Sequence, residues 1–351
     1  MGIFKTVYNQ YPGPCRVVQV NGSEDISLLP SGQAFISSGL CEVMSGAFNC
    51  HGSAQDGSII LFDFNKPYDN TRRIHVLSSS TFDSKCLNPH GLSHWQNPRT
   101  GEVLLFVINH CPDGESIDVF EWIPDEYSLK HTASIQHPLI SSPNDLLAVG
   151  PNSFYYTNDH YFNYRGFKSL ESYLQISFAS VRFYDGDTKE VTQVASSLCW
   201  PNGIAVSPDG RFLYITTSIG LELIIYERNK IDNSLLLAQV IRMAESCDNL
   251  FVLSQSGALL TACHPRIVDV IEHLYNNFSH PAGSLVLNIQ LGPENTENQQ
   301  ERFPDYQIQQ IYSNDGRQLK GSSVAVYHEG SMLVGSIKDN LLYCQVNSVQ
   351  L

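Results

Sequence analysis

Acidic and amide side chains recur in this 351-residue chain immediately before short apolar runs. The fragment NDLLAVGPNSFYYTND, which begins at Asn144, has a polar pair, an apolar run, a turn, a second apolar run and another polar pair. Similar fragments, 46 to 73 residues apart, begin at Glu24, His90, Asn202, Asp248 and Gly321. Carboxylate and amide oxygens are the ligands that Ca²⁺ prefers. If the six fragments meet in space, their first residues form a cation site.

Each fragment has the signature of a β-hairpin, in which short β-type runs flank a turn containing Gly or Pro. Six such repeats, each with room for about four strands, predict an all-β fold: a six-bladed β-propeller with four-stranded blades. We expect a single domain over residues 1–351, with the ring closed by the N- and C-terminal segments. The first strand of each blade lines the axis, so the first residues of all repeats converge at one end of the channel.

The second strand of each blade returns to the same end, which brings further polar residues to the site. These residues are His110, Asn158, Asp159, His160, Cys263 and His264. The repeat heads themselves supply Glu24, Asp25, Asn144, Asp145, Asn202, Asp248 and Asn249. Because neighbouring side chains on a strand point in opposite directions, the paired residues can serve two metal sites at different depths. The sequence has no His-x-His or Cys-x-x-Cys motif that would favour zinc.

Composition narrows the function further. The formal net charge of −14 is wrong for a nucleic-acid partner, whose phosphates require basic side chains. The sequence has no run of about 18 apolar residues, so no membrane span is predicted.

The segment 266–280 breaks the β pattern, because its apolar residues recur at helical spacing. We expect a short helix there, on the face of the site, where it either covers a pocket or simply packs on the propeller.

Several fragments resemble the calcium-dependent paraoxonase/arylesterase family of lactonases, in that family's order and over nearly the whole chain. They include GSEDISLLPSGQAFISSGL, NPHGLS, NDLLAVGPNSFYYTNDHYF, NGIAVSPDGRFLYI, CHP and GSSVAVYHEGSMLVGS. The resemblance implies two Ca²⁺ ions per chain. It assigns a catalytic calcium to Glu24, Asn144, Asn202, Asp248 and Asn249. It assigns a structural calcium to Asp25, Asp145 and the backbone carbonyl of Leu92.

The same resemblance implies a catalytic dyad of His90 and His110 and a disulfide between Cys15 and Cys344. It makes Cys263 a free thiol near the site, which we expect to be buried and inert. We expect the substrate pocket to include Trp200, His160, His264, Ser323 and Glu42. In one loop, Cys41 and Glu42 stand where the family tends to have a basic residue and an aromatic one, and Cys41 and Cys50 are a second candidate disulfide.

These features predict a calcium-dependent hydrolase of lactones and aryl esters, with organophosphate triesters as side substrates. The partner is a small-molecule lactone or ester; the oligomeric state stays open. Two alternatives remain: another six-bladed hydrolase, resembling gluconolactonase or diisopropyl-fluorophosphatase, and a propeller that is only a binding platform. The expected disulfide favours a secreted or extracellular protein, while the lack of a signal peptide in this chain keeps a cytoplasmic location open.

Overall fold

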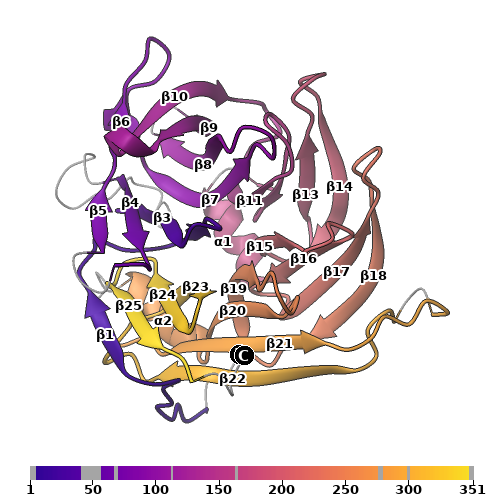
Figure 1. The fold of residues 1–351 in the computed structure, drawn as a ribbon. Helices are drawn as coiled ribbons and strands as arrows, with labels where there is room; N and C mark the ends of the chain where they lie inside the picture. The colour runs from indigo at the N-terminus through magenta and orange to yellow at the C-terminus, as the bar shows by residue number, and fades with distance from the viewer. Residues whose placement is uncertain are drawn as a thin grey trace.

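Six sheets surround a common axis in the computed structural model of the protein (Figure 1). The structure describes residues 5–40, 57–66, 70–111, 114–162, 165–275, 280–298 and 301–347. Each sheet is a blade, and its strands follow one another from the axis outward. The predicted six-bladed β-propeller is thereby confirmed.

The first three blades are built from consecutive strands. The first consists of β2 (Ile26–Leu28), β3 (Gln33–Ser38), β4 (Ser58–Asp63) and β5 (Thr71–Arg73). The second consists of β7 (Pro89–Gln96), β8 (Val103–Cys111), β9 (Gly114–Ile123), β10 (Ser128–Ile135) and, at its edge, β6 (His75–Leu77). The third consists of β11 (Pro143–Ala148), β12 (Phe154–Asn158), β13 (Ala179–Tyr184) and β14 (Val191–Leu198).

The last three blades complete the ring. The fourth consists of β15 (Pro201–Val206), β16 (Phe212–Thr217), β17 (Glu222–Arg228) and β18 (Leu235–Arg242). The fifth consists of β19 (Ser246–Val252), β20 (Leu259–His264), β21 (Ser284–Leu291) and β22 (Tyr306–Asn314). The sixth consists of β23 (Ser322–His328), β24 (Ser331–Ser336), β25 (Leu341–Gln345) and β1 (Cys15–Val18).

One blade departs from the expected four strands. The short strand β6 pairs in parallel with β10 and gives the second blade a fifth strand. Its three residues are too few to show a periodic pattern, so sequence reasoning had no signal for it. Two short 3-10 helices, η1 (Ser84–Cys86) and η2 (Pro124–Glu126), flank strands of the same blade.

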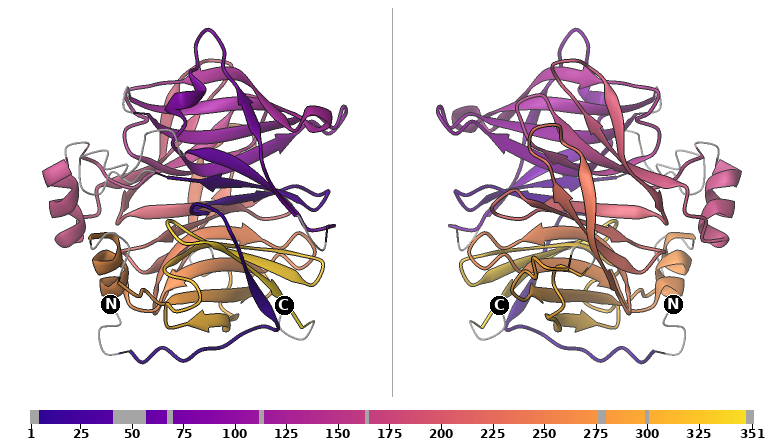
Figure 2. Two further views of the ribbon diagram at one scale, coloured as in Figure 1. Left: turned by 90° about the vertical axis from the view of Figure 1, so that its left-hand side faces the viewer. Right: turned by 90° about the vertical axis from the view of Figure 1, so that its right-hand side faces the viewer.

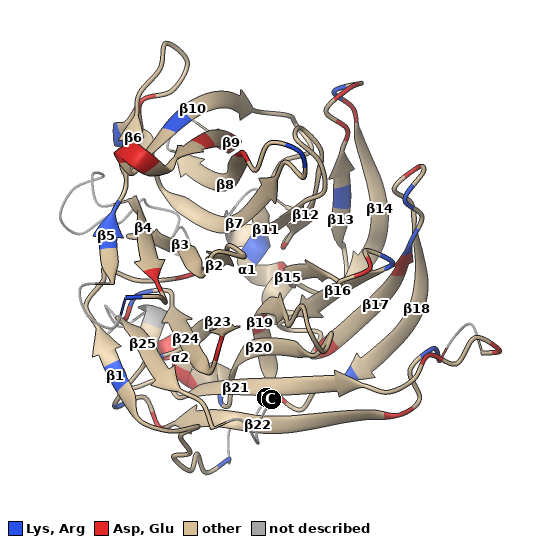
Figure 3. Cartoon of the chain, viewed as in Figure 1, with Lys and Arg blue, Asp and Glu red and all other residues tan. Residues whose placement is uncertain are grey.

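The hydrophobic core is divided into six layers, one between each pair of neighbouring blades. Strands of adjacent blades contribute to each layer; Phe35 and Trp122, for example, pack edge to face across the first and second blades. A sheet inside the ring is covered on both faces, which is why its central strands are nearly continuous runs of apolar residues. Charged residues lie mainly on the outer strands and loops (Figure 3).

Two α-helices project from the same face of the ring (Figure 2). The helix α1 (Arg165–Tyr173) follows β12, and α2 (Ile267–Tyr275) follows β20. The second helix lies within the predicted segment 266–280, of which residues 276–279 are outside the described part of the chain. Among the described residues, no helix has the length and apolar character needed to cross a membrane.

The ring closes where the two ends of the chain pair. Strand β1 is hydrogen-bonded to β25 in the outermost position of the sixth blade, and Cys15 stands directly opposite Cys344. The two cysteines form the expected disulfide, across a sequence separation of 329 residues. A crosslink over so long a loop restricts the unfolded chain strongly.

We predict that replacing both Cys15 and Cys344 by alanine lowers the free energy of unfolding. The loop-entropy model allows a loss of up to roughly 5 kcal/mol. Urea denaturation measures the change, and Cys199→Ala, which removes a buried free thiol, is the control. A double variant that unfolds at the same urea concentration as the parent would show that strand pairing alone closes the ring.

Candidate functional site

The predicted calcium ligands stand at the axial ends of four inner strands. Glu24 and Asp25 immediately precede β2, while Asn144, Asn202 and Asp248 each lie near the start of β11, β15 and β19. The side chains of the predicted catalytic set are buried, between 2% and 6% exposed: Glu24, Asn144, Asn202, Asp248 and Asn249. Residues far apart in the sequence meet there, since Asn249 Nδ2 lies 3.0 Å from Glu24 Oε1. The expectation that these repeat heads converge is confirmed.

A break in strand register occurs at the head of five of the six inner strands. The pairing with the second strand shifts between Pro89 and Leu92, Pro143 and Leu146, Pro201 and Ile204, Cys247 and Leu250, and Ser322 and Val324. Such bulges free residues from the regular ladder and redirect their side chains. In this fold the residues so released are the candidate ligands or their neighbours.

Two glycines let the neighbouring heads approach closely. A Cβ atom on Gly91 would lie 2.6 Å from the carbonyl oxygen of Asn144, and one on Gly203 would lie 2.7 Å from the Cα atom of Asn249. Contacts of that length leave no room for a side chain against backbone atoms. The glycines after His90 and Asn202 therefore set the spacing between adjacent blades at the axis.

Each residue of the predicted catalytic set has one buried oxygen with no hydrogen-bond partner among the described residues. These atoms are Glu24 Oε2, Asn144 Oδ1, Asn202 Oδ1, Asp248 Oδ1 and Asn249 Oδ1. Buried polar atoms are nearly always paired, because leaving one unpaired costs about 1–3 kcal/mol. Five such side-chain oxygens suit a hard cation that prefers oxygen ligands.

The candidate set differs from a metal site built mainly from His, Cys, Asp and Glu side chains. Within the described ranges, no group of three or more His, Cys, Asp or Glu side chains is close enough to hold a metal ion. Three of the five candidate ligands are asparagines, which supply neutral oxygens. A site of this kind suits Ca²⁺ better than a transition metal, which prefers nitrogen or sulfur ligands.

Asp25 and Asp145, the predicted structural ligands, each follow a member of that set in the sequence and are buried with it. Asp25 accepts backbone N–H bonds from Ile26 and Leu92, at 2.7 and 2.6 Å, so it joins the first blade to the second. Asp145 accepts from Leu146 and Ile204, at 2.7 and 2.8 Å, and joins the third blade to the fourth. The Leu92 carbonyl remains a predicted ligand.

Burial and mutual repulsion act on these carboxylates. Burial, followed by the charge of Glu24, raises the pKa of Asp25 to about 7. Burial, followed by the charge of Asp25, raises the pKa of Asp145 well above its ordinary value. In the described part of the chain neither carboxylate has an ion pair with Lys or Arg. A cation between them would favour the ionised forms.

The predicted histidine dyad forms a continuous hydrogen-bonded chain. His90 Nδ1 lies 2.8 Å from His110 Nε2, and His110 Nδ1 bonds to the carboxylate of Glu115. The other nitrogen of His90, Nε2, lies 3.4 Å from Glu24 Oε1. Burial lowers the pKa of His90, but Glu24, and with it Asp159 and Asp248, outweighs burial and raises the pKa to about 9.

Glu115 was not found by sequence reasoning, although its position has a simple origin. It stands opposite His110 in the β8–β9 hairpin, and Cys111 pairs with Gly114. The sequence between His110 and Glu115 contains Pro-Asp-Gly, which is a hairpin-turn signal and could have placed Glu115 beside His110. A second disulfide, Cys86–Cys111, fastens the same hairpin to η1 and was also not predicted.

His160 and Trp200, two of the predicted pocket residues, pack against each other just after β12 and just before β15. Their rings lie 4.8 Å apart, and His160 Nδ1 is 2.7 Å from Asp159 Oδ1. His160 Nε2 is 2.7 Å from Ser172 Oγ on α1, so this histidine anchors the helix. Burial raises the pKa of Asp159, but His160 more than compensates and lowers it below its ordinary range.

Helix α1 was missed because its sequence, RGFKSLESY, is mostly polar and short. It is held by tertiary contacts that the sequence does not display. Lys168 Nζ donates to Ser142 Oγ at 2.7 Å, and the backbone N–H of Tyr161 donates to Glu171 at 3.0 Å. The helix therefore depends on packing against the end of the third blade.

The remaining predicted pocket residues differ in their roles. His264 Nε2 lies 3.5 Å from Asp248 Oδ2, beside the candidate catalytic metal position. Ser323 is fully buried and its hydroxyl donates to the backbone carbonyl of Glu24 at 2.7 Å, so it fixes the backbone at a candidate metal ligand. Glu42, like the candidate pair Cys41 and Cys50, lies outside the described residues.

One prediction was wrong. Cys263 is not a free thiol, because it stands directly opposite Cys247 on β19 and forms a disulfide with it. The prediction rested on the CHP fragment alone and took no account of the residue across the strand pair. The free thiol of the described chain is the buried Cys199.

Comparisons with known proteins agree with this geometry. The family model "Arylesterase" matches residues 12–346. The chain is 34% identical over 327 residues to "Serum paraoxonase/arylesterase 2" of Gallus gallus, covering 93% of this chain and 86% of that protein. It is 35% identical over 325 residues to "Serum paraoxonase/lactonase 3" of Oryctolagus cuniculus, covering 92% and 86%.

Solved structures share the propeller at much lower sequence identity. A gluconolactonase from Xanthomonas campestris has a TM-score of 0.53 and 13% identity, over 98% of this chain and 99% of that one. Regucalcin from Agrobacterium tumefaciens, described as a calcium-binding protein, has a TM-score of 0.55 and 11% identity, over 97% and 96%. These two support the fold, whereas the family match and the sequence relatives settle membership: the chain belongs to the arylesterase family.

Proposed function

We propose that this protein is a calcium-dependent hydrolase of lactones and aryl esters. The observation that carries the proposal is the set of five buried oxygens at the axis that have no hydrogen-bond partner among the described residues. The names of its relatives, which include arylesterase and lactonase, support the reaction class. A binding platform would have no need for a buried ring of unpaired oxygens beside a linked histidine pair.

Two calcium ions fit the residues present. The upper ion would be held by Glu24, Asn144, Asn202, Asp248 and Asn249, and the lower one by Asp25, Asp145 and the Leu92 carbonyl. The upper calcium, when bound, supplies a Lewis acid that polarises the carbonyl oxygen of the substrate and stabilises the oxyanion that develops on it. The lower calcium would neutralise buried carboxylates that link neighbouring blades.

The histidine pair accepts the proton of the attacking water. The carboxylate of Glu115 accepts from His110 Nδ1–H, so His110 Nε2 accepts from His90 Nδ1–H. In this arrangement a neutral His90 has its lone pair on Nε2, beside Glu24. A cation on Glu24 would offset the negative field and bring the pKa of His90 back towards roughly 6.5, where it serves as a base near neutral pH.

Chelation provides the first test of the function. We expect the calcium-loaded protein to hydrolyse an alkyl-substituted lactone and phenyl acetate, and EDTA to abolish both activities and lower the melting temperature. Stability falls because a ligand that binds only the folded state has been removed. Full activity in a sample shown by elemental analysis to be metal-free would overturn the proposal.

A pair of substitutions separates the metal site from the proton chain. Asn202→Ala removes a metal ligand, so we expect kcat to fall by more than about 100-fold and the bound calcium to decrease. His110→Ala removes a group that acts through His90, so we expect a loss on the order of 10- to 100-fold with calcium retained.

The control for these variants is Asn314→Ala. Asn314 is fully buried, like the candidate ligands, but both ends of its amide are hydrogen-bonded, to Tyr312 and Gly316. Its loss should lower stability without changing calcium content. Equal losses of kcat in Asn202→Ala and His110→Ala, with the same calcium content in both, would give the histidines the same weight as the metal.

Substrate preference gives a further prediction. Because Trp200 offers an apolar wall beside the axis, kcat/KM should rise with the length of an alkyl substituent, by up to about fourfold for each buried methylene. A neutral phosphotriester should be a poorer substrate, since phosphorus carries more substituents around the reacting centre. A phosphotriester that exceeds every lactone in kcat/KM would contradict the assignment.

A further inference from the structure

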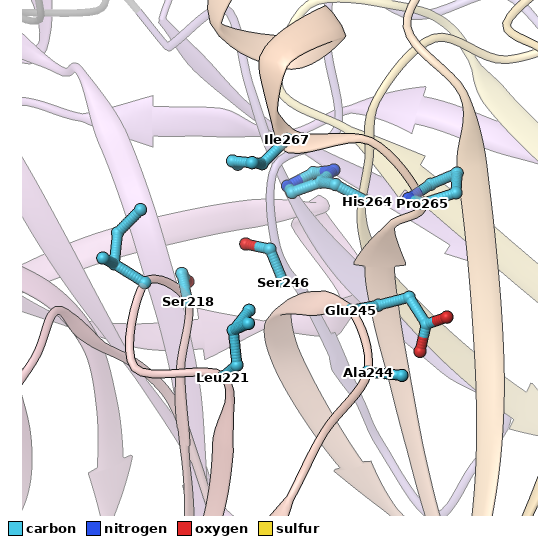
Figure 4. Close-up of a pocket in the computed structure, with 9 residues that line it drawn as sticks. Ser218, Leu221, Ala244, Glu245, Ser246, His264, Pro265 and Ile267 are labelled. Atoms are coloured by element: carbon cyan, nitrogen blue, oxygen red, sulfur yellow. The ribbon is translucent and has the colours of Figure 1, made fainter. Parts of the chain in front are cut away.

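A small pocket opens beside the candidate metal site, on the face that carries the two helices (Figure 4). It has about 260 Å³ of empty space, including its open mouth. Three connections form its walls: the β16–β17 turn, the β18–β19 loop and the segment from β20 into α2. The lining residues are Ser218, Ile219, Leu221, Ala244, Glu245, Ser246, His264, Pro265 and Ile267.

Two polar atoms in this pocket have no hydrogen-bond partner in the described part of the chain. They are Ser246 Oγ and His264 Nδ1, and the two residues are only 3% and 5% exposed. Ser246 and His264 stand directly opposite each other on β19 and β20, and their side chains lie next to each other in Figure 4. The two atoms do not bond to each other, so they do not form a nucleophile–base pair. Both residues line the pocket, and the described part of the chain supplies neither atom with a partner.

The environment of His264 decides what that partner must offer. His264 Nε2 lies 3.5 Å from the carboxylate oxygen Oδ2 of Asp248, and an ionised carboxylate oxygen can only accept a hydrogen bond. A neutral ring with its proton on Nε2, towards Asp248, presents a lone pair on Nδ1 to the pocket. Nδ1 calls for a donor, whereas the Ser246 hydroxyl both donates and accepts. A hydroxyl group satisfies both atoms, because it donates to Nδ1 and accepts from Ser246.

The other lining residues indicate what kind of substituent would carry this hydroxyl group. Leu221, Pro265 and Ile267 present apolar side chains around the two polar atoms. The only acid in the lining, Glu245, is paired with Lys5. Apolar walls around one polar point suit an alkyl chain that carries a single hydroxyl.

The pocket is also held rigid. The Cys247–Cys263 disulfide joins β19 and β20 in the register position next to the Ser246–His264 pair. Ser218 Oγ donates to the Cys247 carbonyl at 2.9 Å, which fastens the β16–β17 turn to the same strand. Fixed polar groups discriminate between ligands more sharply than mobile ones, because they cannot move to find other partners.

We propose that Ser246 and His264 form a specificity subsite that hydrogen-bonds a hydroxyl group on the substrate, so that lactones and esters with hydroxyalkyl chains are preferred over their alkyl counterparts. This inference rests on the proposed function, and it names the class of substrate for that site. Asp248 connects the subsite to the candidate metal site, because its Oδ1 is a candidate metal-binding atom while its Oδ2 faces His264.

The test compares two lactones that differ only in one hydroxyl on the side chain, with the hydroxyl moved along the chain in a short series. For the parent protein we expect the best hydroxylated lactone to exceed its alkyl counterpart in kcat/KM by about five- to tenfold. In Ser246→Ala this ratio should fall to about one, while kcat/KM for the alkyl lactone changes little. A ratio that Ser246→Ala leaves unchanged, or a parent protein that prefers the alkyl lactone throughout, would overturn the subsite.

Ser218→Ala is the matched control. It removes a serine hydroxyl from the same pocket, but one that already bonds to the Cys247 carbonyl, so the preference ratio should persist. His264 is left unchanged because Nε2 faces a candidate metal ligand. A ratio that falls equally in both variants would mean that general loosening of the pocket, rather than the Ser246 hydroxyl, controls the preference.

Binding separates failure of the subsite from failure of the proposed function. Unreactive lactams with and without the side-chain hydroxyl are titrated into the parent protein and Ser246→Ala by calorimetry. Tighter binding of the hydroxylated lactam, lost in Ser246→Ala, supports the subsite even if no lactone is hydrolysed. Equal binding of both lactams by the parent protein would refute it even if lactones are good substrates.

Discussion

The structure depends on the concentration of negative charge and unpaired oxygen atoms at the axis of the ring. Glu24, Asp25, Asp145 and Asp248 are all at most 5% exposed, and the neighbours that supply further oxygens are neutral amides. An isolated buried carboxylate is costly, and several together repel one another. A divalent cation bound there would offset this repulsion, and it would join four blades through one centre.

The propeller fold brings the oxygens together by means of small departures from regular strands. Register breaks at the strand heads release candidate ligand residues, and Gly91 and Gly203 allow adjacent heads to approach. Hydroxyl groups then bond across blades to the backbone beneath the ligands: Thr157 to the Asn202 carbonyl at 2.8 Å and Thr216 to the Asp248 carbonyl at 2.6 Å. The backbone of these candidate ligands is thus fixed, while one side-chain oxygen of each has no partner among the described residues. Such prior placement reduces the reorganisation that metal binding would require.

Sequence reasoning succeeded where a feature repeats and failed where it occurs once. The repeated heads predicted the six inner strands and the convergence of residues such as Glu24 and Asn249, which are 225 positions apart. Helix α1 depends on several tertiary contacts, while Glu115 and the Cys247–Cys263 bond each depend on one strand pairing, so none of them belongs to the repeated pattern. The error at Cys263 shows the difference: the fragment containing it resembles a known block, but its partner is decided by register across the strands.

The most direct test of the account is a crystal structure of the protein grown with calcium. We expect one ion within about 2.3–2.6 Å of the five oxygens that lack partners, with a coordination position left for water or substrate. A second ion should lie near Asp25 and Asp145. A structure at saturating calcium in which no ion touches Asn144, Asn202 and Asn249 would contradict the central claim that the axis is built to hold a cation.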